Sequence, residues 1–296
     1  MSPQPSLRAR LGAYVALTKP RIIELLLVTT VPTMIVAERG MPPLWLIAAT
    51  VAGGTLAAGG ANAINMYVDR DIDRVMKRTR RRPLVTGQVT PRAALTFAVG
   101  LEAAAFAFLW AAVNLLSAAL AVSACLFYVF VYTLWLKRRS RSNIVIGGAA
   151  GAAPVLIGWS AVTGTLDWPP VVLFAVIVYW TPPHFWALAI RYRDEYASVD
   201  VPMLPVVAGL RTTAVRILLY TLLLWGLTVL FAPIAGMGTL YLGAALVLGG
   251  VFTWYAARLV RQTTPGRAMR LFAWSISYVT LLFGAMAADE LVRSGF

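Results

Sequence analysis

Three polar side chains suited to holding a metal ion recur at every fourth position near residue 70: Asn65, Asp69 and Asp73. In a helix these residues lie near one face, because four residues turn the chain through about 400°. The preceding stretch, residues 44–63, carries no charged residue, so the acids lie where an apolar helix meets water. Carboxylates in that position are costly and usually functional. Their oxygens are the ligands that Mg²⁺ prefers, together with substrate phosphates.

A second acidic cluster follows another apolar stretch, and the two clusters together contain six of the 12 acidic residues: Asp69, Asp71, Asp73, Asp194, Glu195 and Asp200. A similar short sequence follows each cluster, at residues 82–87 and at residues 202–209. We interpret this as a weak repeat of two four-helix halves, about 20–136 and 143–257, with an extra helix at about 269–290. The repeat would place both acidic ends across a central cavity. The alternative is that neighbouring basic residues simply neutralise interfacial acids.

Composition predicts an all-α polytopic membrane protein. The chain is 59% hydrophobic and its mean hydropathy is +0.74, and apolar stretches of about twenty residues recur along it. We expect one integral-membrane domain, 1–296, with nine transmembrane helices around a central cavity. The predicted spans are 20–37, 44–66, 93–113, 115–136, 143–163, 169–190, 212–233, 236–257 and 269–290.

The charge pattern predicts the orientation of these spans. The net charge is +14, and all but Arg39 and Arg293 of the 26 basic residues flank the spans on one side. The positive-inside rule then predicts a cytoplasmic N-terminus and an external C-terminus. The basicity is therefore topological, and we expect no nucleic-acid partner.

Topology does not account for the basic residues closest to the acids, which are Arg78, Arg81, Arg82 and Lys137. Arginine binds phosphate through a two-pronged fork and lysine binds it as a point charge. The alternative for each residue is a topology anchor or an anionic-lipid contact. Acids and bases above an apolar cavity would suit a long allylic diphosphate, with its head at the acids and its tail between helices.

Four sequence blocks resemble the intramembrane, aspartate-motif prenyltransferases, which include 4-hydroxybenzoate polyprenyltransferase and chlorophyll synthase. The first is Asn65 to Asp73 followed by residues 78–83; it is shared across that superfamily. Blocks at 143–159, 181–189 and 201–206 are similar to the heme O synthase branch alone. The resemblance extends from residue 19 to residue 209, and beyond the seventh span it is only hydropathic.

The resemblance implies farnesyl transfer from farnesyl diphosphate to a vinyl group of heme b, with water addition, giving heme O and diphosphate. It implies a Mg²⁺ ion held by Asn65, Asp69, Asp73 and Asp194, with the three aspartates catalytic. Many members carry a second Asp-xxx-Asp pair, whereas Asp194 is followed by Ser198, so the second half of the metal shell is less well defined. The implied location is a bacterial inner membrane with the site facing the cytoplasm, in contact with membrane lipids. Heme A synthase or terminal oxidase assembly proteins are the implied protein contacts.

His184 is the only histidine in the chain and lies near the predicted cytoplasmic end of a span. A neutral imidazole could bind heme iron or pair with a propionate, and Asn143 would lie nearby. The alternative is an interfacial histidine beside the Pro182-Pro183 kink. Glycines at 147, 148 and 151 predict close helix packing or room for a flat macrocycle. Tryptophans at 159, 180 and 186 are expected as membrane-interface anchors rather than substrate walls.

Three other functions remain open at this level. A prenyltransferase with an aromatic or quinone-precursor acceptor would share the aspartate motif. A transporter would place its ionisable residues near mid-span, whereas these acids lie at predicted helix ends. A non-catalytic oxidase assembly protein would use the acids only as docking charges.

Overall fold

The computed structural model describes residues 6–295, without the side chains of residues 21–27. Within this range every regular element is a helix, which confirms the all-α prediction. The long helices are α2 (Pro20–Glu38), α3 (Leu44–Val68), α5 (Pro91–Ala112), α6 with η1 (Leu115–Leu126 and Phe127–Leu136), α8 (Asn143–Thr163), α9 (Trp168–Arg191), α12 (Leu210–Ala235), α13 (Thr239–Arg261) and α14 (Pro265–Ser294). The chain is an integral membrane protein.

Eight of these helices in the described part of the chain are long and apolar enough to cross a bilayer. The first predicted span, 20–37, corresponds to α2. Without the residues whose side chains are not described, α2 is represented by Val28–Glu38, which is apolar but shorter than the eight spans. The count of nine spans therefore stays a prediction.

The ends of the long helices follow from local sequence signals. Thr90 and Thr264 cap α5 and α14 by accepting a hydrogen bond from the residue three positions on, and a proline follows each cap. Both features favour a helix start. Gly164 and Gly236 end α8 and α12 with positive φ angles of 69° and 66°, a conformation that glycine adopts without strain.

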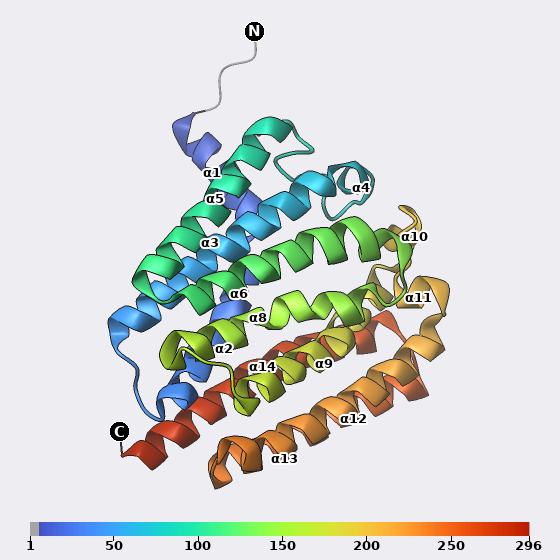
Figure 1. Cartoon of the computed structure of the whole chain (residues 1–296). Coiled ribbons are helices and arrows are strands. Elements are labelled where there is room, and N and C mark those ends of the chain that lie inside the picture. Colours follow the sequence, from blue (N-terminus) through green and yellow to red (C-terminus); the bar gives the residue numbers. More distant parts are fainter. Residues whose placement is uncertain (1–5, 296) are drawn as a thin grey trace.

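The helices pack into two neighbouring groups joined by α8. In the first group α3 packs against α5, α5 against α6, and α6 against α8. In the second group α8 packs against α9, α9 against α12, α12 against α13, and α13 against α14. Helix α14 also packs against α9 and α2, and α2 packs against both α8 and α3, so α2 contacts both groups (Figure 1).

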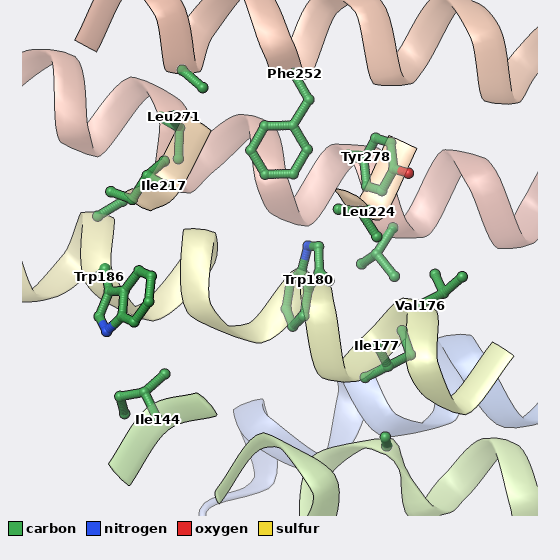
Figure 2. Packing of buried hydrophobic residues seen from close by; sticks show 14 of the residues in the cluster. Ile144, Val176, Ile177, Trp180, Trp186, Ile217, Leu224, Phe252, Leu271 and Tyr278 are labelled. Atoms are coloured by element: carbon green, nitrogen blue, oxygen red, sulfur yellow. The ribbon is translucent and has the colours of Figure 1, made fainter. Parts of the chain in front are cut away.

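The largest buried apolar cluster lies in the second group. Figure 2 shows Trp180 and Trp186 on α9, with Ile144 of α8 on one side and Phe252 and Tyr278 of α13 and α14 on the other. Both tryptophans are buried, as is the third one expected at an interface, Trp159. The prediction that these three are interface anchors was wrong, because they fill the space between helices.

Short helices gather at one end of the bundle, which we call the loop end. They include α4 (Arg70–Val75), α7 (Lys137–Arg139), α10 (Arg193–Ala197) and α11 (Leu204–Val207), while α1 (Leu7–Thr18) precedes α2. Figure 1 shows α4, α10 and α11 together at this end and the C-terminus at the other. The segments after α3 and after α9, which contain the two acidic clusters, therefore lie at the same end.

Candidate active site

The side chains of Asn65, Asp69 and Asp73 form a buried stack at the loop end of α3, as the spacing predicted. Asp69 ends α3 and begins α4, and its backbone N–H still donates to the carbonyl of Asn65 at 2.9 Å. The N–H of Asp73 donates to the carbonyl of Asp69, also at 2.9 Å. The helical repeat thus continues across the junction, and all three residues are at most 4% exposed.

Each buried acid has a basic partner from a different part of the chain. Lys137 forms a salt bridge and hydrogen bond with Asp69 Oδ2. Arg82 donates to Asp73 Oδ2 at 2.6 Å. These are two of the four basic residues that were predicted, with Asn65, to contact diphosphate, and the structure brings both to the acids. Asp71 points away, being 60% exposed at its side chain, and binds Arg138 through both oxygens at 2.7 Å.

Lys137 reaches Asp69 because η1 is a π-helix, with hydrogen bonds that skip five residues rather than four. The N–H of Lys137 donates to the carbonyl of Tyr132, and Thr133 Oγ1 donates to the carbonyl of Tyr128 at 2.8 Å. Thr133 then accepts a hydrogen bond of 3.1 Å from Asn65 Nδ2. Short π segments are rare and often occur at functional sites. Here Thr133, within η1, contacts Asn65, and Lys137, which directly follows η1, contacts Asp69.

Lys19 completes the group and was missed by the sequence analysis. Its Nζ donates to Asn65 Oδ1 at 2.8 Å, and its backbone is left-handed, with φ 53° and ψ 63°. Burial, together with the positive charges of Arg82 and Lys137, lowers the pKa of Lys19 to about 7. The sequence contains one indication of this role, because Lys19 directly precedes Pro20, the proline that begins α2. A left-handed residue at that position directs its side chain away from the helix axis.

The other two predicted phosphate contacts lie on the loop between α4 and α5. Arg78 stacks over the ring of Tyr192 at 5.6 Å, and its backbone N–H donates to Glu195 Oε2 at 3.4 Å. The two loops that follow α3 and α9 therefore touch. Arg81 is exposed and shows no side-chain partner among the described residues.

The second acidic cluster does not join the buried stack. Asp194 and Asp200 are exposed, and Glu195 contacts the Arg78 loop. Among residues 6–295, no three acidic, histidine or cysteine side chains are close enough to hold one ion. The structure therefore brings Asp69 and Asp73 together without Asp194, whose metal role stays a prediction.

The two heme candidates lie in different surroundings. Asn143 is fully buried at the start of α8, where its Nδ2 donates to the Lys137 carbonyl at 3.3 Å. His184 is 8% exposed and contacts α14, where its Nδ1 lies 2.7 Å from Ser275 Oγ. The His184 ring stacks against Trp180 and Phe272, with centroid distances of 4.4 and 4.5 Å.

The donor chemistry of the buried stack fits a hard divalent cation. Asn65, Asp69 and Asp73 offer only oxygen ligands from their carbonyl and carboxylate groups. One of these atoms, Asp69 Oδ1, is buried and has no hydrogen-bond partner among the described residues. Arg138 Nη2 lies 3.9 Å from this oxygen. A buried carboxylate oxygen without a close donor is an available ligand position.

An open pocket of about 460 Å³ lies next to the stack, lined by Val68, Arg70, Asp71, Arg74, Leu134 and Arg138. Neither Asp69 nor Asp73 lines it. The pocket is therefore a basic surface beside the site and not the site itself.

Comparison with known proteins identifies the class to which this geometry belongs. The profile of the UbiA prenyltransferase family matches residues 26–281. The chain belongs to the UbiA prenyltransferase family. Relatives in the family named protoheme IX farnesyltransferase include those of Parafrankia sp. EAN1pec, 57% identical, and Frankia alni, 56% identical. The matches cover 96% of this chain and 91% of the first relative, and 97% and 100% for the second.

Solved structures of the UbiA family share the fold. A digeranylgeranylglyceryl phosphate synthase has a TM-score of 0.79 at 17% identity, covering 96% of this chain and 99% of that one. A UbiA homolog from Archaeoglobus fulgidus, solved with GPP and Mg²⁺ bound, has a TM-score of 0.63 at 16% identity, covering 93% and 99%. The aspartate-motif resemblance seen in the sequence is thus confirmed at the level of family and fold.

Proposed function

We propose that this UbiA-family enzyme transfers the farnesyl group of farnesyl diphosphate to a vinyl group of heme b, giving heme O and diphosphate. The allylic C–O bond breaks and diphosphate leaves with the electron pair. The vinyl carbon bonds to the farnesyl carbon, and water adds to the resulting cation beside the macrocycle and releases a proton. The relatives at 56 to 57% identity carry the name of this reaction.

The observation that carries the proposal is the buried stack of Asn65, Asp69 and Asp73 with its ring of cations. Gathering two carboxylates, two lysines and an arginine at one helix end, all of them buried or partly buried, is costly because it removes charge from water. A reaction in which negative charge develops on diphosphate at this point would explain why these charged groups are held together there.

Mg²⁺ is the proposed cofactor. Asn65, Asp69 and Asp73 would hold it, with Asp194 as the proposed ligand from the second loop. When bound, the ion supplies charge neutralisation for the leaving diphosphate. This role agrees with the donor set and with Asp69 Oδ1, which has no hydrogen-bond partner in the described part of the chain.

Basic side chains bind and orient the diphosphate. Lys19, Lys137 and Arg82 already converge on the stack, contacting Asn65, Asp69 and Asp73 respectively, so their charges are preorganised where negative charge develops. Arg78 and Arg81 extend from the loop between α4 and α5 as further phosphate contacts. The contact of Arg78 with Tyr192 and Glu195 supports a joint cover that limits water access to the farnesyl cation.

His184 is the proposed ligand for the iron of the heme substrate, with Asn143 as a second contact to the macrocycle. Nδ1 of His184 contacts Ser275, which leaves Nε2 without a hydrogen bond among the described residues. Prenyl transfer to heme and prenyl transfer to a phenol or quinone precursor would use the same aspartate stack. The two reactions therefore differ in the residues that bind the acceptor.

The proposed location is the bacterial inner membrane, with the loop end facing the cytoplasm, where farnesyl diphosphate is made. The basic residues at that end support this orientation. A reporter fused after Arg82 should read cytoplasmic, and a reporter at the C-terminus should read external. Contact with heme A synthase or oxidase assembly proteins would pass the product on and belongs to the same proposal.

Turnover with purified protein tests the function. Protein in lipid nanodiscs is given farnesyl diphosphate, Mg²⁺ and either heme b or 4-hydroxybenzoate, and products are separated by chromatography and mass. Heme O formation with matching release of pyrophosphate is expected. Turnover of 4-hydroxybenzoate but not of heme would show that the acceptor is aromatic rather than heme. The absence of turnover with either acceptor would contradict the assignment as a prenyltransferase.

A further inference from the structure

The His184 ring has one polar contact within the described structure, and that contact is a serine on another helix. Ser275, on α14, is fully buried, and its Oγ lies 2.7 Å from His184 Nδ1. Its backbone carbonyl also accepts a hydrogen bond of 2.8 Å from Trp180 Nε1. No motif in the sequence marks Ser275.

The direction of the Ser275–His184 hydrogen bond follows from the second contact of the hydroxyl. Ser275 Oγ lies 2.6 Å from the carbonyl oxygen of Phe272, which can only accept. Two oxygens at that distance require a hydrogen between them, and a serine hydroxyl has only one. The hydroxyl therefore donates to Phe272 and must accept from Nδ1–H of His184.

We infer that Ser275 holds His184 in the Nδ1–H tautomer and so leaves the Nε2 lone pair for the iron of the heme substrate. A neutral imidazole carries one N–H, so a proton on Nδ1 excludes one on Nε2. Metal-binding histidines commonly donate their other N–H to an oxygen that fixes the tautomer and the ring orientation. The inference rests on the proposed function for the role of iron, but the tautomer itself does not.

The surroundings of the ring agree with a neutral, fixed imidazole. Trp180 and Phe272 stack against it at interplanar angles of 21° and 27°, and Phe185 contacts it edge-on. No acidic partner for the ring is present in the described part of the chain, and burying an unpaired charge is costly. Ser275 is thus a positioning residue, because it acts on heme through His184.

Because His184 is the only histidine, ¹⁵N-histidine labelling reports on this one ring. Solid-state ¹⁵N spectra of the heme-free protein in lipid bilayers distinguish both neutral tautomers and the imidazolium. The expected spectrum has a protonated Nδ1 and an unprotonated Nε2. Ser275→Ala should move the population toward Nε2–H, whereas Ser275→Thr, which keeps a hydroxyl, should restore the wild-type pattern.

The matched control is Thr221→Ala. Thr221 is another buried helix hydroxyl, 1% exposed, that donates to the carbonyl four residues earlier at 2.8 Å. Its removal should leave the histidine spectrum unchanged. A general loosening of the core would instead alter the spectrum in both alanine variants.

Heme titration then tests whether the tautomer of His184 affects heme binding. Ser275→Ala should raise the apparent dissociation constant for heme b about 10-fold or more, as loss of such orienting partners does, and should shift the Soret band. The affinity for a farnesyl diphosphate analogue should not change. A wild-type spectrum with Nε2–H, or an imidazolium, overturns the inference without affecting heme as substrate. A correct tautomer combined with unchanged heme binding in His184→Ala also overturns it, since iron would then not use Nε2.

Discussion

Lys19 donates a hydrogen bond of 2.8 Å to the side-chain oxygen of Asn65, across 46 positions of sequence. The bond ties the start of α2 to the end of α3 and adds a third cation to the acidic stack. Lys19 holds this position with a left-handed backbone, a conformation that costs a non-glycine residue about 1–2 kcal/mol. A strained residue at a charged site suggests a functional side chain.

Replacing Lys19 should therefore weaken diphosphate binding. We expect Lys19→Met to raise the dissociation constant of a non-reactive farnesyl diphosphate analogue about 10-fold to 100-fold, the worth of one hydrogen bond to a charged group. Calorimetry in nanodiscs measures it. Arg10→Met, which removes an exposed charge from α1, is the control. Equal binding by Lys19→Met and wild-type protein would remove Lys19 from the site.

The Asp69–Lys137 pair allows structural and catalytic roles to be separated. Their side chains are 1% and 14% exposed, and removing one partner of a buried pair typically costs 3–5 kcal/mol. Asp69→Asn should lower both thermal stability and heme O formation. Adding Lys137→Met should recover much of the stability but none of the activity. Thermal denaturation and product assays on the same samples measure the two effects.

Asp71 supplies the control for the Asp69 experiment. It lies two positions away and pairs with Arg138 at the surface, where such pairs contribute about 1 kcal/mol or less. Asp71→Asn should keep both stability and activity near wild type. Recovered activity in the Asp69→Asn/Lys137→Met variant would mean that the pair is only structural.

Much of the fold could be predicted because hydropathy reports directly on helices that cross a bilayer. The predicted span 143–163 coincides with α8, and 44–66 differs from α3 by two residues at one end. The predicted span 236–257 ends four residues before α13 does, and 269–290 is four residues short of α14 at each end. Arginines at these helix ends continue the helix into the polar region. The four-residue spacing likewise predicted the buried face of Asn65, Asp69 and Asp73.

The remaining parts of the site depend on contacts between distant segments. Nothing in residues 127–136 marks a π-helix, since the pattern is apolar on all sides. The roles of Lys19 and Ser275 follow only from where α2 and α14 pack. The buried tryptophans were misplaced for a related reason, because sequence cannot separate a helix face toward lipid from one toward another helix. The two-half repeat and the central cavity stay predictions.

Gly147 should be sensitive to a single added methyl group. A Cβ there would lie 2.2 Å from Tyr132 Cδ2, so Gly147→Ala must displace the Tyr132 side chain or the part of η1 that carries it. Such overpacking costs about 1–3 kcal/mol, and the shift should also lower activity through Lys137. Gly151→Ala in the same helix meets nothing within 4 Å and should be neutral. Melting temperatures of the two variants provide the comparison.

Asp194 and Asp200 offer a test of the second metal-binding segment. Both are exposed, so neutralising either one should leave stability unchanged. If Asp194 binds Mg²⁺, Asp194→Asn should raise the Mg²⁺ concentration needed for half-maximal rate about 10-fold, while Asp200→Asn should not. Titration of activity with Mg²⁺ after treatment with a chelator measures this. Identical Mg²⁺ curves for wild type and Asp194→Asn would exclude the ligand role.

The π-helical stretch of η1 makes the length of this segment as important as its composition. A straight α-helix turns about 100° per residue, so deleting one residue between Phe127 and Leu136 would rotate everything that follows. The ammonium group of Lys137 would then leave the acids, although every remaining side chain would be unchanged. Substitutions in this stretch should be tolerated more readily than insertions or deletions. In a sequence alignment, a gap placed within this stretch would therefore match the wrong residue of a relative to Lys137, the partner of Asp69.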